Sequence, residues 1–228
     1  MNGVKFGDKH SITDWDLLMT SRGYQDAEVD ENYIKIPGSN GEKDLTEAFG
    51  EVKYNTRVLS PSFDMFQKPS DWLDLKDKIT NYLHGKKMKI IYDTDPNYYY
   101  IGRCKVADFS NDFTVAHITI EAKCEPYKYK VNPTIVTNEV SAGNTYTYTN
   151  DRKTVVPKLT LSAAMTLEFK GNSYSLGAGT HTILGIEFVE GENEITVTTG
   201  SGTLTVEYQE ARLWNIKLFW TRTIFYMI

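Results

Sequence analysis

Cysteine, histidine and basic charge are all scarce in this chain, and each scarcity removes a class of function. Its 228 residues include two cysteines, Cys104 and Cys124, and four histidines. No CxxC, HxH or HxxxH spacing occurs, so neither a cysteine-based zinc or redox site nor a local histidine metal site is supported. The 25 basic residues are outnumbered by 30 acidic ones, a formal charge of −5. That balance argues against a protein that reads or coats nucleic acid.

Long apolar stretches are also missing. A helix that spans a bilayer takes about 20 apolar residues. The most apolar segment, WNIKLFWTRTIFYMI at 214–228, is shorter and carries Lys217 and Arg222. The N-terminal residues lack the apolar segment of a secretion signal. We therefore expect no membrane insertion, and we treat 214–228 as an atypical apolar tail whose origin the sequence leaves open.

One stretch, IPGSNGEKDLTEAF at 36–49, could be taken for a phosphate-binding loop. A Walker loop has four residues between its glycine and a Gly-Lys pair, followed by Ser or Thr. Here only two residues separate Gly38 from Gly41, and Asp44 stands where the hydroxyl is required. Nearby acids would also repel phosphate. We interpret the stretch as a structural loop shaped by Gly38 and Gly41, followed by one short helical turn that Asp44 caps.

The remaining sequence contains no local pattern of catalysis. There is no GxSxG and no serine, cysteine or histidine group with the cues of a triad. His84 comes just before Gly85 at the expected end of a helix, a position typical of a structural histidine. We predict that the protein is not an enzyme, with no catalytic, cofactor-binding or metal-ligating residues and no cofactor.

Most segments have the alternation of short strands, and one is clearly helical. In PSDWLDLKDKITNYLHGKK, apolar residues recur at helical spacing and predict a helix over 71–83, with Ser70 as a candidate cap. The segments YYYIGRCKV and AHITIEAKC predict two antiparallel strands. If their turn centres on Asn111-Asp112, Cys104 faces a residue near Thr119 rather than Cys124, so two free thiols are expected.

Composition changes near residue 131. The chain becomes rich in threonine there, with turns every eight to twelve residues or so, the spacing of an all-β sandwich. The sequence therefore predicts a mainly β protein of two domains. An N-terminal β-barrel-like domain with one helix covers 1–130, and a β-sandwich covers 131–213.

Four phrases of the N-terminal half occur together in a specific order: HSITDWDLLMTSR, IPGSNGEKDLTEAFGEVKYNTR, YLHGKKMKIIYDTDPNYYYIGRCKV and ITIEAKCEPYKY. In this order and spacing they resemble the distal tail (Dit) proteins of siphophages and prophages of Gram-positive bacteria. The C-terminal half is similar to the second domain of that family in pattern only. Members of the family tend to end near the EARL motif, so residues 214–228 depart from the pattern.

The resemblance implies a fold and a role. The family's N-terminal domain carries a helix and a protruding hairpin, and six copies close a ring at the tail tip. A galectin-like sandwich lies outside the ring. The implied partners are the major tail tube protein and the tail-associated lysin, tail-fibre, receptor-binding or baseplate proteins. The implied location is the virion tail tip, after assembly in the host cytoplasm.

The run Tyr98, Tyr99 and Tyr100 is the candidate interface of such a ring. In a strand, Tyr98 and Tyr100 share one face and Tyr99 takes the other. Packing inside the domain is an equally open explanation for all three. A different class of function also stays open, because the sandwich could be a carbohydrate-binding module for host cell-wall saccharides. Exposed tryptophan or tyrosine on a sandwich face would favour that alternative.

Overall fold

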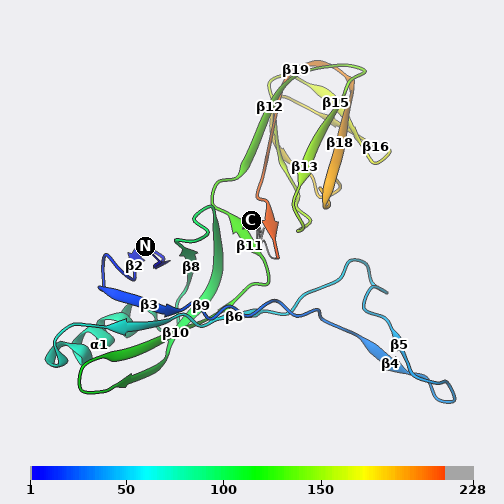
Figure 1. The fold of residues 1–228 in the computed structure, drawn as a ribbon. Helices are drawn as coiled ribbons and strands as arrows, with labels where there is room; N and C mark the ends of the chain where they lie inside the picture. Colours follow the sequence, from blue (N-terminus) through cyan, green and yellow to red (C-terminus); the bar gives the residue numbers. More distant parts are fainter. Residues whose placement is uncertain (1, 214–228) are drawn as a thin grey trace, which may run out of the picture.

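The computed structural model describes residues 2–213, so the apolar tail at 214–228 lies outside the described residues. Within 2–213 the chain forms twenty strands, one α-helix and one 3-10 turn. The prediction of a mainly β protein is confirmed. Three parts can be followed in Figure 1: a domain built on one large sheet, a β-sandwich, and a long arm that ends in a small hairpin.

The N-terminal domain is built on one large antiparallel sheet. Its main path has the order β2-β1-β8-β9-β10-β7-β3, with β6 paired to β10 and β11 paired to both β9 and β20. The bounds of these strands are β1 (Val4–Phe6), β2 (Lys9–His10), β3 (Leu17–Ser21), β6 (Arg57–Leu59), β7 (Ser62–Met65), β8 (Lys87–Tyr92), β9 (Tyr98–Asn111), β10 (Ala116–Cys124), β11 (Lys128–Lys130) and β20 (Ala211–Arg212).

Helix α1 (Trp72–Leu83) covers the core face of this sheet. Trp72, Ile79 and Leu83 are buried, and each such side chain contributes about 2 kcal/mol through removal from water. The helix follows a 3-10 turn, η1 (Pro69–Asp71), and its N-cap is Asp71 without a side-chain bond. The expected cap, Ser70, instead donates to the Asp71 carboxylate, because the 3-10 turn takes Ser70 out of the capping position.

The register of β9 and β10 differs from the expectation. Cys104 lies opposite Ala122, and Thr119 lies opposite Asp108. The turn is later than Asn111-Asp112 because the Asp112 carboxylate accepts the backbone N–H groups of Thr114 and Val115 and closes the turn there. Both cysteines are free and buried, as expected.

The second domain packs two four-stranded antiparallel sheets face to face. Their orders are β12-β19-β14-β17 and β13-β18-β15-β16. Inward residues alternate with outward ones, and the buried core includes Tyr148, Leu167, Phe188 and Val206. The bounds are β12 (Thr134–Ser141), β13 (Thr145–Asn150), β14 (Lys158–Leu161), β15 (Met165–Phe169), β16 (Asn172–Leu176), β17 (Gly179–Thr182), β18 (Gly191–Thr199) and β19 (Ser201–Tyr208).

The chain enters and leaves the sandwich at the same place. After β19 it returns to the first domain, where β20 pairs with β11 in the register Tyr129↔Ala211. Tyr99, Tyr129 and Ala211 form a small separate core at this junction. The end of the second domain is therefore fixed to the sheet of the first.

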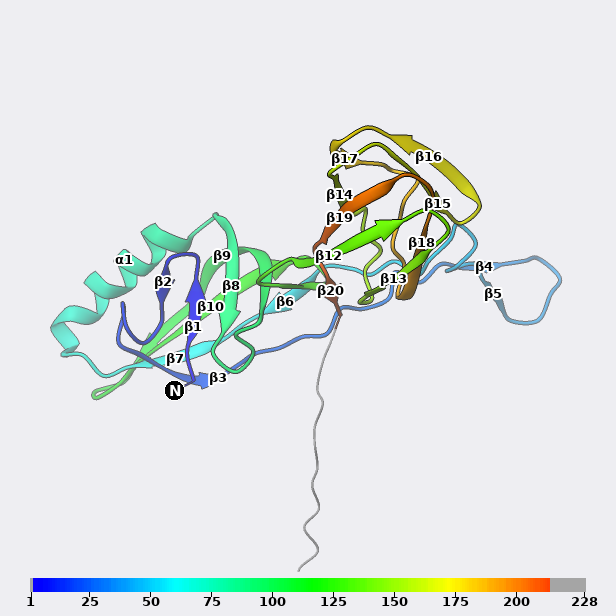
Figure 2. The ribbon, with the colours of Figure 1, turned by 90° about the horizontal axis from the view of Figure 1, so that it is seen from above.

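The arm is the segment 25–56, between β3 and β6. Its two sides run out together, joined by an isolated bridge between Val29 and Tyr54. At its far end β4 (Tyr33–Lys35) pairs with β5 (Glu42–Asp44). Figures 1 and 2 both show this hairpin far from α1 and beyond the body of either domain.

Candidate interaction site

The stretch taken from the sequence as a loop and a helical turn is the hairpin at the end of the arm. Gly38 and Gly41 have φ angles of 82° and 79°, which a residue with a side chain adopts only with strain. Both lie in the connection between β4 and β5. Asp44 ends β5 instead of beginning a helix, because 42–44 pairs with β4 and fixes an extended backbone.

Asp44 still organises the turn that follows it. Its Oδ1 accepts the backbone N–H of Thr46 at 2.9 Å. Hydrogen bonds from Thr46 hold the pKa of this carboxyl below its ordinary value. An ionised carboxylate therefore stands where a Walker loop would need a hydroxyl, and the arrangement is that of a turn.

The root of the arm is held by a buried arginine, Arg57. Its Nε donates to the Gln25 carbonyl at 3.0 Å, and its Nη1 donates to the carbonyls of Leu213 at 2.8 Å and Pro126 at 3.3 Å. The guanidinium also lies over the ring of Tyr100, 5.3 Å from its centroid. One side chain thus joins the arm, the linker after β10 and the end of β20.

The arm also contacts the base of the sandwich. The Tyr54 hydroxyl accepts a hydrogen bond from Arg152 at 3.0 Å, and Arg152 forms an ion pair with Glu190 at 2.7 Å. Thr154 donates to the Glu51 carboxylate at 3.0 Å. These contacts fix the near half of the arm, whereas within residues 2–213 the strands β4 and β5 pair only with each other.

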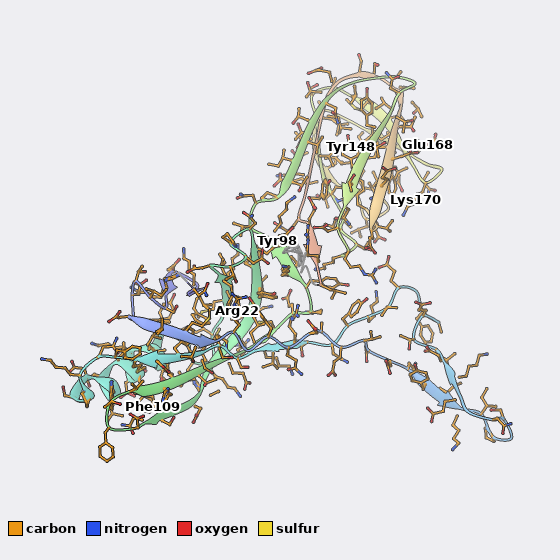
Figure 3. All side chains as sticks on the ribbon, in the orientation of Figure 1. Arg22, Tyr98, Phe109, Tyr148, Glu168 and Lys170 are labelled. Atoms are coloured by element: carbon orange, nitrogen blue, oxygen red, sulfur yellow. The ribbon has the colours of Figure 1, made fainter. Side chains whose placement is uncertain are left out.

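The three candidate interface tyrosines pack largely inside the chain. Tyr100 is 5% exposed and lies in the main core of the first domain, and Tyr99 is 7% exposed and stacks on Tyr129. Tyr98 is half-buried at the junction of the domains, where Figure 3 labels it, beside the guanidinium of Arg212. Tyr99 and Tyr100 thus pack mainly within the chain, which was the alternative left open for this run, and Tyr98 is the most accessible of the three.

Charged groups surround Tyr98 and fasten the two domains together. Buried Lys128 pairs with Asp95, and Arg212 Nη2 lies 2.7 Å from the Asp151 carboxylate. Lys130 Nζ contacts Glu210 at 2.7 Å. Burial opposes ionisation of Glu210, but the bonds from Lys130 and Thr134 outweigh it and lower its pKa. The junction is a network of ion pairs rather than a flexible linker.

The outer face of the large sheet, opposite α1, carries a row of cations that sequence reasoning missed. Lys87 on β8 is the register partner of Arg103 on β9, and Arg103 is the partner of Lys123 on β10. We call these three exposed residues the basic row. It borders a depression of about 580 Å³ whose lining also includes Thr56 and Ile101. Sequence reasoning missed the row because the expected turn at Asn111-Asp112 pairs Arg103 with Ile120 instead of Lys123.

The described residues offer no cluster of metal ligands, and both of their thiols are buried with raised pKa values. No group of three His, Cys, Asp or Glu residues within 2–213 could hold a metal ion. Burial raises the pKa of the Cys104 thiol to about 12, so it stays protonated and unreactive at neutral pH. Helix α1 is also too short and too polar to cross a bilayer, and it is the one α-helix of the described residues.

Comparisons with known proteins agree with this architecture. Residues 14–124 match the family described as the phage tail protein RIFT-related domain. Among solved structures, the chain is similar to the SPP1 Dit (gp 19.1) protein, with a TM-score of 0.68 and 16% identity. The match covers 92% of this chain and 99% of that one. No curated protein sequence gives a significant match.

The two matches cover different lengths of the chain. The family match covers the β3–β10 region of the first domain, including the arm. The structural match extends over the sandwich as well. Residues 14–124 are thus similar to the phage tail protein RIFT-related domain family, and the chain as a whole has the fold of the SPP1 Dit protein.

Proposed function

We propose that the protein is the hub of a phage tail tip, in which six copies close a ring. The ring joins the major tail tube protein to the baseplate, where tail-associated lysin, tail-fibre and receptor-binding proteins attach. Assembly takes place in the host cytoplasm, and the role requires no catalysis. The similar SPP1 protein is described as a paradigm of the hub adsorption apparatus in phages that infect Gram-positive bacteria, which supports the proposal.

The observation that carries this proposal is the arm. Its hairpin exposes apolar side chains, with Tyr33 49%, Ile34 40% and Ile36 43% exposed, and Phe49 beside it is 92% exposed. A two-stranded hairpin alone in water is at best marginally stable. A surface of this kind is expected to be covered by another molecule. A second copy would cover this surface in every subunit at once, and a repeated head-to-tail contact makes a ring when its rotation closes.

Removal of the hairpin tests the proposal. A variant in which a short Gly-Ser link replaces 32–45 keeps the bridge between Val29 and Tyr54, and both domain cores are untouched. We expect the intact chain to form hexamers in light scattering and the variant to remain monomeric with an unchanged circular dichroism spectrum. The substitution Phe113→Ser is the matched control, since Phe113 is a 99% exposed aromatic on another hairpin. Hexamers formed equally well by the deletion variant would contradict the role of the arm.

The alternative function, a carbohydrate-binding module, lacks the support it needs on the sandwich. The exposed large apolar side chains within 131–213 are Val131, Ile135 and Leu184, none of which is aromatic. Tyr148 points into the sandwich, whereas Glu168 and Lys170 lie on its outer side (Figure 3). Retention of the purified chain on host wall polysaccharide would be needed to revive this alternative.

A further inference from the structure

The arm holds all of the net charge of the protein. Between Asp26 and Lys53 there are eight acidic and three basic residues, a formal charge of −5. The whole chain also has a formal charge of −5, so the remaining residues balance. Within 2–213, Asp26 is the one arm carboxylate in an ion pair, with Arg57. The other arm carboxylates form no ion pair within the described residues, although Glu42 lies opposite Lys35 in the register of the hairpin.

The basic row carries an excess of positive charge, opposite to that of the arm. Residues that face each other directly across strands lie close enough for like charges to destabilise the pair. Lys87, Arg103 and Lys123 occupy such positions on three consecutive strands. The carboxylates of the same depression neutralise only part of this charge, since Glu125 pairs with Lys87 of the row at 2.7 Å and Glu121 pairs with Lys105, outside the row, at 2.8 Å. Two carboxylates therefore face four cations, the three of the row and Lys105.

The same chain cannot bring its arm and its basic row together without unfolding the root of the arm. Thr56, where the arm returns to β6, lies at the rim of the depression. From there the arm runs outward, held at its root by Arg57 and at Tyr54 by Arg152. Figures 1 and 2 show the hairpin at the far end of the molecule from β8, β9 and β10.

We propose that the acidic arm of one copy docks on the basic row of the next copy, at Lys87, Arg103 and Lys123. This inference rests on the proposed ring and names its acceptor surface. The two surfaces have opposite charge, and Ile101 in the depression offers apolar contact to the exposed side chains of the arm. Complementary charge of this kind steers encounter and fixes register between partners.

Charge reversal tests the contact from both sides. One variant combines Lys87→Glu, Arg103→Glu and Lys123→Glu. A second variant combines Glu28→Lys, Glu31→Lys and Glu42→Lys, three exposed arm residues. Each alone should weaken self-association at least about tenfold, and the variant that carries both sets should restore it to within a few fold. The matched control reverses Lys68, Lys78 and Lys158, exposed cations outside the basic row, and should assemble like the wild type.

Carbodiimide cross-linking of a mixture of unlabelled and ¹⁵N-labelled protein then identifies the partner. We expect peptides that link an arm carboxylate to Lys87 or Lys123 and that combine both isotopes. Links within one isotope only, or full assembly of the reversed-row variant, would overturn the inference while leaving the ring in place. A wild-type chain that forms no ring at any protein concentration or salt would instead refute the proposed function itself. Binding of the row to nucleic acid, with assembly unchanged by the reversals, would also overturn it.

Discussion

At the scale of single residues, Arg57 decides how three segments meet. Its side chain is fully buried, and its donors end on carbonyl groups of the arm, the linker after β10 and the last residue after β20. The paired carboxylate of Asp26 is 76% exposed, so the ion pair itself contributes little. Arg57 stabilises the fold mainly by donating hydrogen bonds to carbonyl groups that would otherwise lack a donor.

Replacing Arg57 should therefore be costly. We expect Arg57→Ala to lower the free energy of unfolding of the first domain by about 2–4 kcal/mol, because buried acceptors lose their donor and a cavity forms. Urea denaturation followed by circular dichroism measures the change. Arg22→Ala is the matched control, since Arg22 is exposed, and it should change the same quantity by less than about 0.5 kcal/mol. An Arg57→Ala variant as stable as this control would refute the role of Arg57 in joining the three segments.

Gly41 gives a prediction of a different kind, confined to the hairpin. A Cβ at this position would meet no atom within 4 Å, so the obstacle is the φ angle of 79° rather than a clash. Gly41→Val should strain the turn by about 1–3 kcal/mol and leave both domain cores intact. Hydrogen exchange of the hairpin amides should become faster while the global midpoint stays unchanged.

Asn40→Val provides the control for that strain. Asn40 lies in the same connection and is not among the residues with positive φ. Its replacement should leave the exchange of the hairpin amides close to that of the wild type. Equal exchange in both variants would mean that the turn tolerates a β-branched residue at position 41.

The residue scale also shows what sequence can and cannot reveal. Gly38 and Gly41 stand out in the sequence because a glycine pair in a polar stretch signals positive φ. Arg57 does not stand out, since an arginine is usually exposed and its partners at 25, 126 and 213 are far apart in the chain. Its burial depends on where two domains and an arm converge, which no local pattern encodes.

At the scale of secondary-structure elements, the β9–β10 pair carries the clearest lesson. Alternation correctly indicates two antiparallel strands, yet their register depends on the turn that Asp112 closes and on a register shift between Thr119 and Ile120. The expected position of that turn placed Cys104 opposite Thr119 instead of Ala122. The same shift hides the alignment of Lys87, Arg103 and Lys123, which is visible only with the correct register.

The ion pair between Lys87 on β8 and Glu125 after β10 predicts that the stability of the fold depends on pH. The hydrogen bond from Lys87 lowers the pKa of Glu125 below its ordinary value of 4.5, against the opposing effect of burial. Below pH 4.5 the unfolded chain therefore takes up a proton at this group before the folded chain does. The resulting stability is present above pH 4.5 and is lost as the pH falls through the folded pKa.

Glu125→Gln isolates that effect. The free energy of unfolding of this variant should fall less steeply on acidification below pH 4.5 than that of the wild type, in urea titrations at a series of pH values. Glu192→Gln is the control, because Glu192 is exposed and forms no ion pair among the described residues. Identical slopes for wild type and Glu125→Gln would show that the bond with Lys87 does not stabilise the fold.

At the scale of the whole molecule, a domain built on one large sheet is joined by ion pairs to a β-sandwich, and an arm extends beyond both. The mainly β organisation could be expected from composition and turn spacing. The arm could be expected only from the family resemblance, which implies a protruding hairpin, because its residues resemble any polar loop and its extended path depends on contacts at its root. The acidic run DAEVDE at 26–31 was the one visible sign of an unusual segment.

The proposed ring is tested most directly by the mass and shape of the purified full-length chain. Mass photometry combined with negative-stain imaging should show a ring of six copies of the 26.0 kDa chain, with six-fold symmetric class averages. A uniform monomer at high protein concentration, with no ring in the images, would contradict the proposed hub.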